Sequence, residues 1–310
     1  MVDDGTNMFS IDNLTSVLQP EQMDSFRFCG KSLVGTLPRV FGGQVLGQAL
    51  HAATATVGND RHAHSVHAHF LRIGDIHQDI NYQVDVVRDG GSFSTRSIVA
   101  EQAGKAIFHA TLSFHIPESG LSHQMAMPDD IPRPDELENE ADRRQRLGMP
   151  TPRFPMMALL PKATLDVRQR FPLEGVDVVH REPFQGFWFK FGEAFFGNPE
   201  NQALSDSRVT HQALLAFVSD MGLLSTGIRP HTESMLRDKI QAASLDHSIW
   251  LHAPARVDQW LYYHTDSPLA GGGRDFCRGS IFTESGILVA STAQEALIRI
   301  RNEGPDVLLS

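Results

Sequence analysis

The sequence has few cysteines and a deficit of basic charge. Only Cys29 and Cys277 occur in 310 residues, and they form neither a C-x-x-C pair nor a zinc-finger spacing, which is typical of proteins from a reducing compartment. The 27 basic side chains are outnumbered by 37 acidic ones, giving a formal net charge of -10. This balance argues against a partner that is bound by neutralising a phosphate backbone. We therefore expect no nucleic-acid partner.

Targeting and membrane signals are also missing. The sequence contains no run of about 18 apolar residues, so we expect no membrane span. The acidic start MVDDGTNMFSIDNL lacks the basic region and apolar core of a signal peptide. The last residues, Val307 to Ser310, do not form an S-K-L type peroxisomal address. These absences predict a cytoplasmic protein.

No motif of a common metal or nucleotide site is present. The sequence lacks a G-x-S-x-G elbow, a Walker A loop and an H-E-x-x-H helix. Four histidines, His62, His64, His67 and His69, fall in one predicted strand. Strand alternation assigns His62 and His64 to one face and His67 and His69 to the other, so they cannot converge on one ion. We expect no metal and no cofactor.

Two parts of the chain have the same order of elements. Hydrophobic residues make up 41% and charged residues 21%, which is ordinary globular composition. Apolar and small residues recur at helical spacing from Gly42 to Val57, and two strand-rich stretches follow, His64 to Asp75 and Ile80 to Ile116. A second helix is predicted from His211 to Leu224, again followed by strand-like segments. Each part is predicted to be an α+β unit with an antiparallel sheet.

Matching landmarks indicate that the two parts are repeats. His64-Ser65 recurs as His247-Ser248, Gly90-Gly91 as Gly272-Gly273 and Gly104 as Gly286, each displaced by 182 or 183 residues. Chance matches of such short peptides would not keep one order and one displacement, so we interpret the chain as a duplication. A segment rich in proline and charge separates the repeats and is typical of a linker. The predicted units are residues 1–118, a linker at 119–160 and residues 161–310.

The second unit is predicted to open with two strands, at Val176–Pro183 and Gly186–Phe195. In the latter, Phe187, Phe189 and Phe191 alternate onto one face, which is expected to join the core.

Two polar residues stand out in apolar surroundings. Asp220 ends the run ALLAFVS of the second predicted helix, and Gln294 interrupts the last predicted strand between small and apolar neighbours. A buried carboxylate costs several kcal/mol unless it is paired, so such a residue is a functional candidate. The alternative is a frayed helix end or a structural hydrogen bond for Asp220, and an ordinary half-exposed strand position for Gln294.

Several segments in order resemble the bacterial acyl-CoA thioesterase II family and its peroxisomal relatives. The match spans Phe28 to Arg301 and rests on FGGQVLGQAL, HSVHAHFLRIGD, VVRDGGSFSTRSIVAEQAGKAIFHATLSF, FVSDMGLL, ASLDHSIWLH and GILVASTAQEALIR. The resemblance implies an α+β double hotdog, with two antiparallel sheets each wrapped around a long central helix. It further implies an acyl-CoA substrate with a medium to long chain, and a homo-oligomer, either a dimer or a tetramer.

The resemblance also implies a catalytic set in the second unit. The family holds its hydrolytic water with an Asp on the second central helix, a Thr or Ser before D-H-S, and a Gln in the closing strand. The matching positions are Asp220, Ser244 and Gln294. Ser244 departs from the Thr of many bacterial members but keeps the hydroxyl. The position of the first unit that is equivalent to Gln294, 182 residues earlier, is Leu112. The first unit is therefore expected to be structural or to line the substrate site.

Two alternatives remain open at this stage. A hotdog enoyl-CoA hydratase or dehydratase would need a His as acid and base, for which His64 or His247 could serve. A non-catalytic acyl-CoA binding protein would need no such residue, although it would have no reason to retain all three polar groups. Residues for the CoA phosphates are not assigned: Arg72, Arg88 and Arg96 are candidates, with solvated strand charges as the simpler interpretation.

Overall fold

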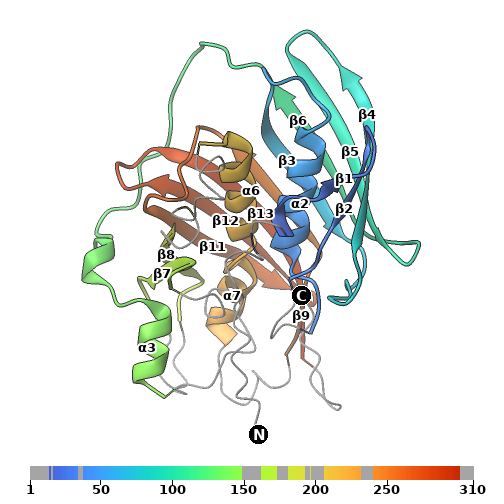
Figure 1. Ribbon diagram of the computed structural model, residues 1–310. Coiled ribbons are helices and arrows are strands. Elements are labelled where there is room, and N and C mark those ends of the chain that lie inside the picture. The colour runs from blue at the N-terminus through green and yellow to red at the C-terminus, as the bar shows by residue number, and fades with distance from the viewer. Residues whose placement is uncertain are drawn as a thin grey trace, which may run out of the picture.

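One continuous antiparallel sheet of thirteen strands dominates the fold (Figure 1). The computed structural model describes residues 14, 17–33, 38–148, 162–172, 181–192, 196, 206–231 and 240–300. Its strand order is β1-β2-β4-β5-β6-β3-β10-β13-β12-β11-β8-β7, and β9 also pairs with β13. The bounds in the first half are β1 Glu21–Gln22, β2 Arg27–Gly30, α2 Gly42–Thr54, β3 His62–Phe70, β4 Ile80–Asp89, β5 Phe93–Gln102 and β6 Lys105–His115.

The second half repeats this plan after a connecting segment that contains η1 Pro134–Glu136 and α3 Glu140–Arg146. Its elements are β7 Leu165–Gln169, β8 Phe184–Phe191, α6 Arg208–Ser219, α7 Leu223–Ile228, η4 Arg229–His231, β9 Ile240–Ser244, β10 Asp246–Leu251, β11 Leu261–Gly271, β12 Arg274–Thr283 and β13 Leu288–Ile300. Of the strand predicted at 176–183, positions 176–180 lie outside the described residues. The division at 118 and 160 stays a prediction.

The expectation of two separate sheets needs correction, because β3 and β10 pair and join the halves into one sheet. Val66 lies opposite Ile249 in this pairing, and these two positions are themselves 183 residues apart. A pair of equivalent residues that face each other marks a local two-fold axis. The turn glycines Gly104 and Gly286 both have positive φ, 71° and 83°, which agrees with the duplicated hairpin.

The helices are shorter than the sequence patterns suggest. The first ends at Thr54 instead of Val57. The second ends at Ser219, with Asp220 as its C-cap. Gly222 then adopts φ 91°, a left-handed conformation that breaks the helix before α7 begins at Leu223. Among the described residues, every helix falls short of the length and apolar character needed to cross a membrane.

The helices α2 and α6 lie side by side and antiparallel on the same face of the sheet (Figure 1). Two glycines of α2 permit this approach. A Cβ on Gly47 would lie 2.9 Å from the carbonyl oxygen of Ala213, and one on Gly43 would collide with the carbonyl oxygen of Phe217. Small residues spaced four apart therefore let the two helix backbones touch.

The strand residues that were expected in the core are buried. Phe187, Phe189 and Phe191 are each 1% exposed or less. The expectation that they join the core is confirmed. The connecting segment also packs against the second half, since the indole N–H of Trp188 donates to the carbonyl of Pro132 at 2.9 Å.

The close helix contact leads to a stability prediction for Gly47→Leu. Leucine has a higher intrinsic helix propensity than glycine, yet its side chain would meet Ala213 and Leu18, so the helices must separate. We expect the free energy of unfolding to fall by about 1–3 kcal/mol, the usual cost of overpacking. Urea denaturation followed by circular dichroism measures this change.

The matched control is Gly91→Ala, because a Cβ there meets no atom of the described residues within 4 Å. Equal urea midpoints for Gly47→Leu and Gly91→Ala would show that the helix contact is looser than described.

Candidate active site

Asp220 lies at the C-terminal end of α6, and its carboxyl group points at the N-terminus of α2. Its side chain is 5% exposed. The backbone N–H of Gly43 donates a hydrogen bond to the carboxylate. A Cβ on Gly42 would lie 2.7 Å from Oδ2, so the approach depends on the absence of a side chain there. Phe41, the N-cap of α2, provides no capping side chain, and Asp220 fills this role from the other half.

Burial controls the protonation of this carboxyl group. Removal from water raises the pKa of Asp220 to about 7, and the hydrogen bond from Gly43 opposes the rise only in part. The negative end of its own helix dipole also disfavours the charged form. Oδ1 has no hydrogen-bond partner among the described residues. Asp220 is thus a buried carboxyl group that can exchange a proton near neutral pH, not a frayed helix end.

Gln294 and Ser244 contact each other directly. The side-chain amide of Gln294, on β13, donates from Nε2 to the hydroxyl oxygen of Ser244 at 3.0 Å. Ser244 is the last residue of β9 and is 9% exposed, while Gln294 is 2% exposed. Gln294 therefore lies in the interior and not at a half-exposed strand position.

His247 links this pair to Asp220. Its Nδ1 lies 2.8 Å from Oε1 of Gln294 and 4.0 Å from Oδ1 of Asp220. Its Nε2 lies 2.9 Å from the hydroxyl of Ser219. Burial lowers the pKa of His247 to about 4, so the ring is neutral at pH 7. Because an amide oxygen can only accept, Nδ1 carries the proton and Nε2 is left as an acceptor.

The structure thus brings the three predicted residues into one cluster, with His247 at its centre. In the sequence His247 stands out only as a repeat marker and a possible base, and its bridging position was not predicted. A signal was available, since His247 and Ile249 share one face of a strand by alternation. Ile249 is fully buried, which turns that face towards the core.

A cavity of about 190 Å³ lies next to the cluster and is built by both halves. Gly42 and Ser244, which contact Asp220 and Gln294, form part of its wall. The first half adds Arg39, Phe70 and Arg72. All three predicted residues come from the second half, whereas both halves line the space beside them.

The three arginines considered for CoA phosphates differ in their surroundings. Arg72 is exposed and lines the cavity. Arg88 is exposed on β4 and does not line it. Arg96 is 2% exposed, so its interpretation as a solvated charge is wrong.

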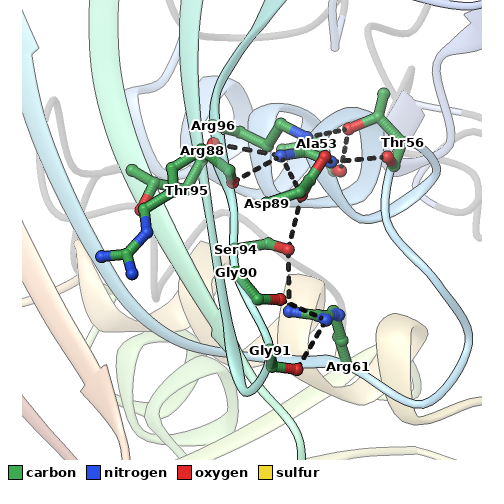
Figure 2. Close-up of polar contacts among 10 residues, drawn as sticks. All are labelled: Ala53, Thr56, Arg61, Arg88, Asp89, Gly90, Gly91, Ser94, Thr95 and Arg96. Atoms are coloured by element: carbon green, nitrogen blue, oxygen red, sulfur yellow. Dashed lines mark hydrogen bonds and ion pairs between the residues drawn. The ribbon is translucent and has the colours of Figure 1, made fainter.

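Figure 2 shows the polar contacts of the guanidinium group of Arg96, which is buried in the protein. It donates to both the hydroxyl and the carbonyl oxygen of Thr56, just beyond α2, each at 2.9 Å. It also pairs with Asp89 at 2.9 Å. The ion pair stabilises the β4–β5 hairpin against the C-terminal end of α2 and leaves no donor for a ligand phosphate.

The four histidines of β3 all lie on the outer face of the sheet, contrary to the alternation argument. A β-bulge between Ala63 and Ser65 shifts the register. His62 therefore pairs with His115, and His67 with Thr111, on the face that is turned away from the buried Leu112 and Phe114. His64 contacts Ser113 on this same face at 2.8 Å. Among the described residues, no three His, Cys, Asp or Glu side chains gather to hold a metal ion.

Comparison with known proteins gives consistent matches over both halves. The family described as acyl-CoA thioesterase matches residues 167–297, and the family described as acyl-CoA thioesterase N-terminal domain matches residues 34–115. Acyl-coenzyme A thioesterase 8 of Mus musculus is 37% identical over 299 residues, covering 93% of this chain and 89% of that protein.

Solved structures agree with these matches. The acyl-CoA thioesterase II TesB2 from Mycobacterium marinum has a TM-score of 0.74 and 36% identity, covering 93% of this chain and 99% of that one. A hot dog fold protein of unknown function from Alicyclobacillus acidocaldarius, at 17% identity, has a TM-score of 0.70 and covers 93% of this chain and 98% of that one. The latter supports the fold alone. By sequence and by fold, the chain belongs to the acyl-CoA thioesterase family of hydrolases.

Proposed function

We propose that this protein hydrolyses medium- to long-chain acyl-CoA to a fatty acid and CoA, with a water molecule as the nucleophile. The observation that carries the proposal is the buried carboxyl group of Asp220. It has a pKa of about 7, and its Oδ2 lies against Gly42, which lines the same cavity as Ser244. Family membership supports the thioester class of substrate. The cytoplasmic location and the dimer or tetramer stay predictions.

Asp220 is suited to activate water because its Oδ1, which has no hydrogen-bond partner in the described part of the chain, can accept a proton. Gln294 and Ser244 would orient that water, since the amide has a second N–H and the hydroxyl can both donate and accept. The first turn of α2 would stabilise the oxyanion of the tetrahedral intermediate, because its N–H groups carry the positive end of the helix dipole. Collapse of this intermediate breaks the C–S bond and releases the CoA thiolate, which takes up the proton.

The hydratase alternative receives little support. His247 is 0% exposed, and both of its ring nitrogens have hydrogen-bond partners, so it cannot reach a substrate. His64 lies on the outer face of the sheet, away from the cavity. Incubation with palmitoyl-CoA and with crotonyl-CoA separates the two reactions: we expect thiol release from the former and no loss of enoyl absorbance from the latter.

The roles of Gln294 and Ser244 can be tested by substitution. We expect Gln294→Ala and Ser244→Ala each to lower kcat at least about tenfold, because each removes a group that orients the attacking water. Ser244→Thr keeps the hydroxyl and is expected to retain activity within about threefold. Thiol release from palmitoyl-CoA measures all three.

Ser291→Ala is the matched control, since that hydroxyl lies on β13 but contacts His252 on the other side of the strand. Wild-type rates in both alanine variants, or equal losses in Ser244→Ala and Ser244→Thr, would contradict the proposed roles.

Asp220→Asn has opposite effects on activity and stability. We expect at least about a tenfold loss of kcat, because an amide is no base. The folded state keeps the Asp220 proton up to about pH 7, whereas the unfolded chain releases it near 3.8. The folded state binds more protons in this interval, so the unfolding free energy of the wild type falls as pH rises through it.

The amide that Asp220→Asn introduces does not titrate, and the variant should gain about 2–3 kcal/mol relative to the wild type between about pH 5 and pH 8. Urea unfolding at the two pH values measures the difference. If the unfolding free energies of the wild type and of Asp220→Asn change by the same amount between the two pH values, the pKa of this carboxyl group is ordinary and its role as a base fails.

Arg72 is expected to contact the anionic head group of CoA. Arg72→Gln should raise KM about two- to fivefold with kcat unchanged, the size of effect typical for one exposed ion pair. The rise should shrink at high ionic strength, because salt screens exposed charges. Arg88→Gln, an equally exposed position outside the cavity, is the control, and an equal rise in KM there would reject a specific contact.

A further inference from the structure

A second cavity of about 220 Å³ lies at the opposite end of β9 from the candidate active site. Four isoleucines contribute to its wall: Ile228 of α7, Ile240 of β9, and Ile298 and Ile300 of β13. Arg274 and Arg299 also line it. The isoleucines give it a largely apolar surface, and it has two arginines in its wall, as does the cavity beside Ser244, which contains Arg39 and Arg72.

One face of β9 extends from one region to the other, and Ala242, midway along it, lines neither cavity. Ile240, Ala242 and Ser244 are its buried residues and alternate with less buried ones. Directly opposite on β13 lie Ile300, Ile298 and Ala296 respectively. Opposed residues on antiparallel strands share a face, so one row runs from Ser244 and Ala296, past Ala242, to the isoleucines of the cavity.

The small side chains in this row are the informative feature. Ala242 and Ala296 lie between the Ser244–Gln294 pair and the isoleucines, and helix α7 packs over β9 and β13. From Ser244 to Ile240 the strand rises about 13 Å. Each extended residue contains three backbone bonds, so a polymethylene chain of about twelve bonds covers the same length.

We infer that the acyl tail of the substrate runs along β9 past Ala242 into the isoleucine cavity, so that Ala242 and Ile240 determine chain-length preference. This inference rests on the proposed thioesterase function. The thioester would lie at Ser244 and Gln294, with the CoA head group at the cavity lined by Arg39 and Arg72. Each additional methylene that reaches the apolar row strengthens binding by up to about fourfold.

The test compares Ala242→Leu with the wild type on saturated acyl-CoAs from C4 to C16. A larger side chain at this position obstructs the row beyond the thioester. We expect kcat/KM for C12 to C16 to fall at least about tenfold, with C4 and C6 within about twofold. Ile240→Ala enlarges the far end, and it should raise the ratio of C16 to C12 activity.

Leu297→Phe is the matched control, because it adds bulk to β13 at a position between Ala296 and Ile298 on the other face. An unchanged chain-length profile in both Ala242→Leu and Ile240→Ala, or an equal loss at every length in a folded Ala242→Leu protein, overturns the inference. If Ala242→Leu does not fold, the result for Ile240→Ala decides.

Binding separates this inference from the proposed function. Isothermal titration with the non-hydrolysable hexadecyl and butyl thioethers of CoA reports occupancy of the row without any reaction. If the wild type released no thiol from any acyl-CoA, the proposed function would fail. Selective loss of hexadecyl-thioether binding in Ala242→Leu would still support the tail site. Equal affinity of the wild type for the hexadecyl and the butyl thioether would reject it.

Discussion

The contact between the carboxyl group of Asp220 and the first turn of α2 is the interaction on which the candidate active site depends. It requires two antiparallel helices in backbone contact, so that the end of α6 meets the start of α2. Gly43 and Gly47 permit that contact, and Gly42 leaves room for the carboxyl group. Neither half contains both the acid and the helix N-terminus, so the site requires the duplicated chain.

A series of buried, hydrogen-bonded side chains holds the other polar residues of the site near this contact. It runs from Ser219 through His247 and Gln294 to Ser244, and every link is 3.0 Å or shorter. Such a network inside a protein is stable only when its donors and acceptors match. Because burial keeps His247 neutral, the ring holds one orientation of the Gln294 amide, which in turn directs an N–H towards Ser244.

The sequence predicted much of this arrangement and missed specific parts for physical reasons. Asp220 could be found because a carboxylate after an apolar helical run is costly, and the repeat could be found from landmark spacing. Ser244 has no local signal and came from the family resemblance. The pairing of β3 with β10 depends on contacts distant in sequence, which no periodicity reveals. Arg96 was misread because strand alternation cannot show that Thr56 and Asp89 would surround it.

The bulge in β3 explains why equivalent histidines have different environments in the two halves. His64 and His247 occupy the same position of the repeat, yet His64 is the extra residue of the bulge and its ring lies on the outer face. In the second half the register along β13 shifts between Ser244 and Ser248, and the side chain of His247 lies in the interior. A local difference in register thus breaks the internal symmetry. After duplication, such a slip would let one copy specialise in chemistry and free the other from that constraint, without altering the framework they share.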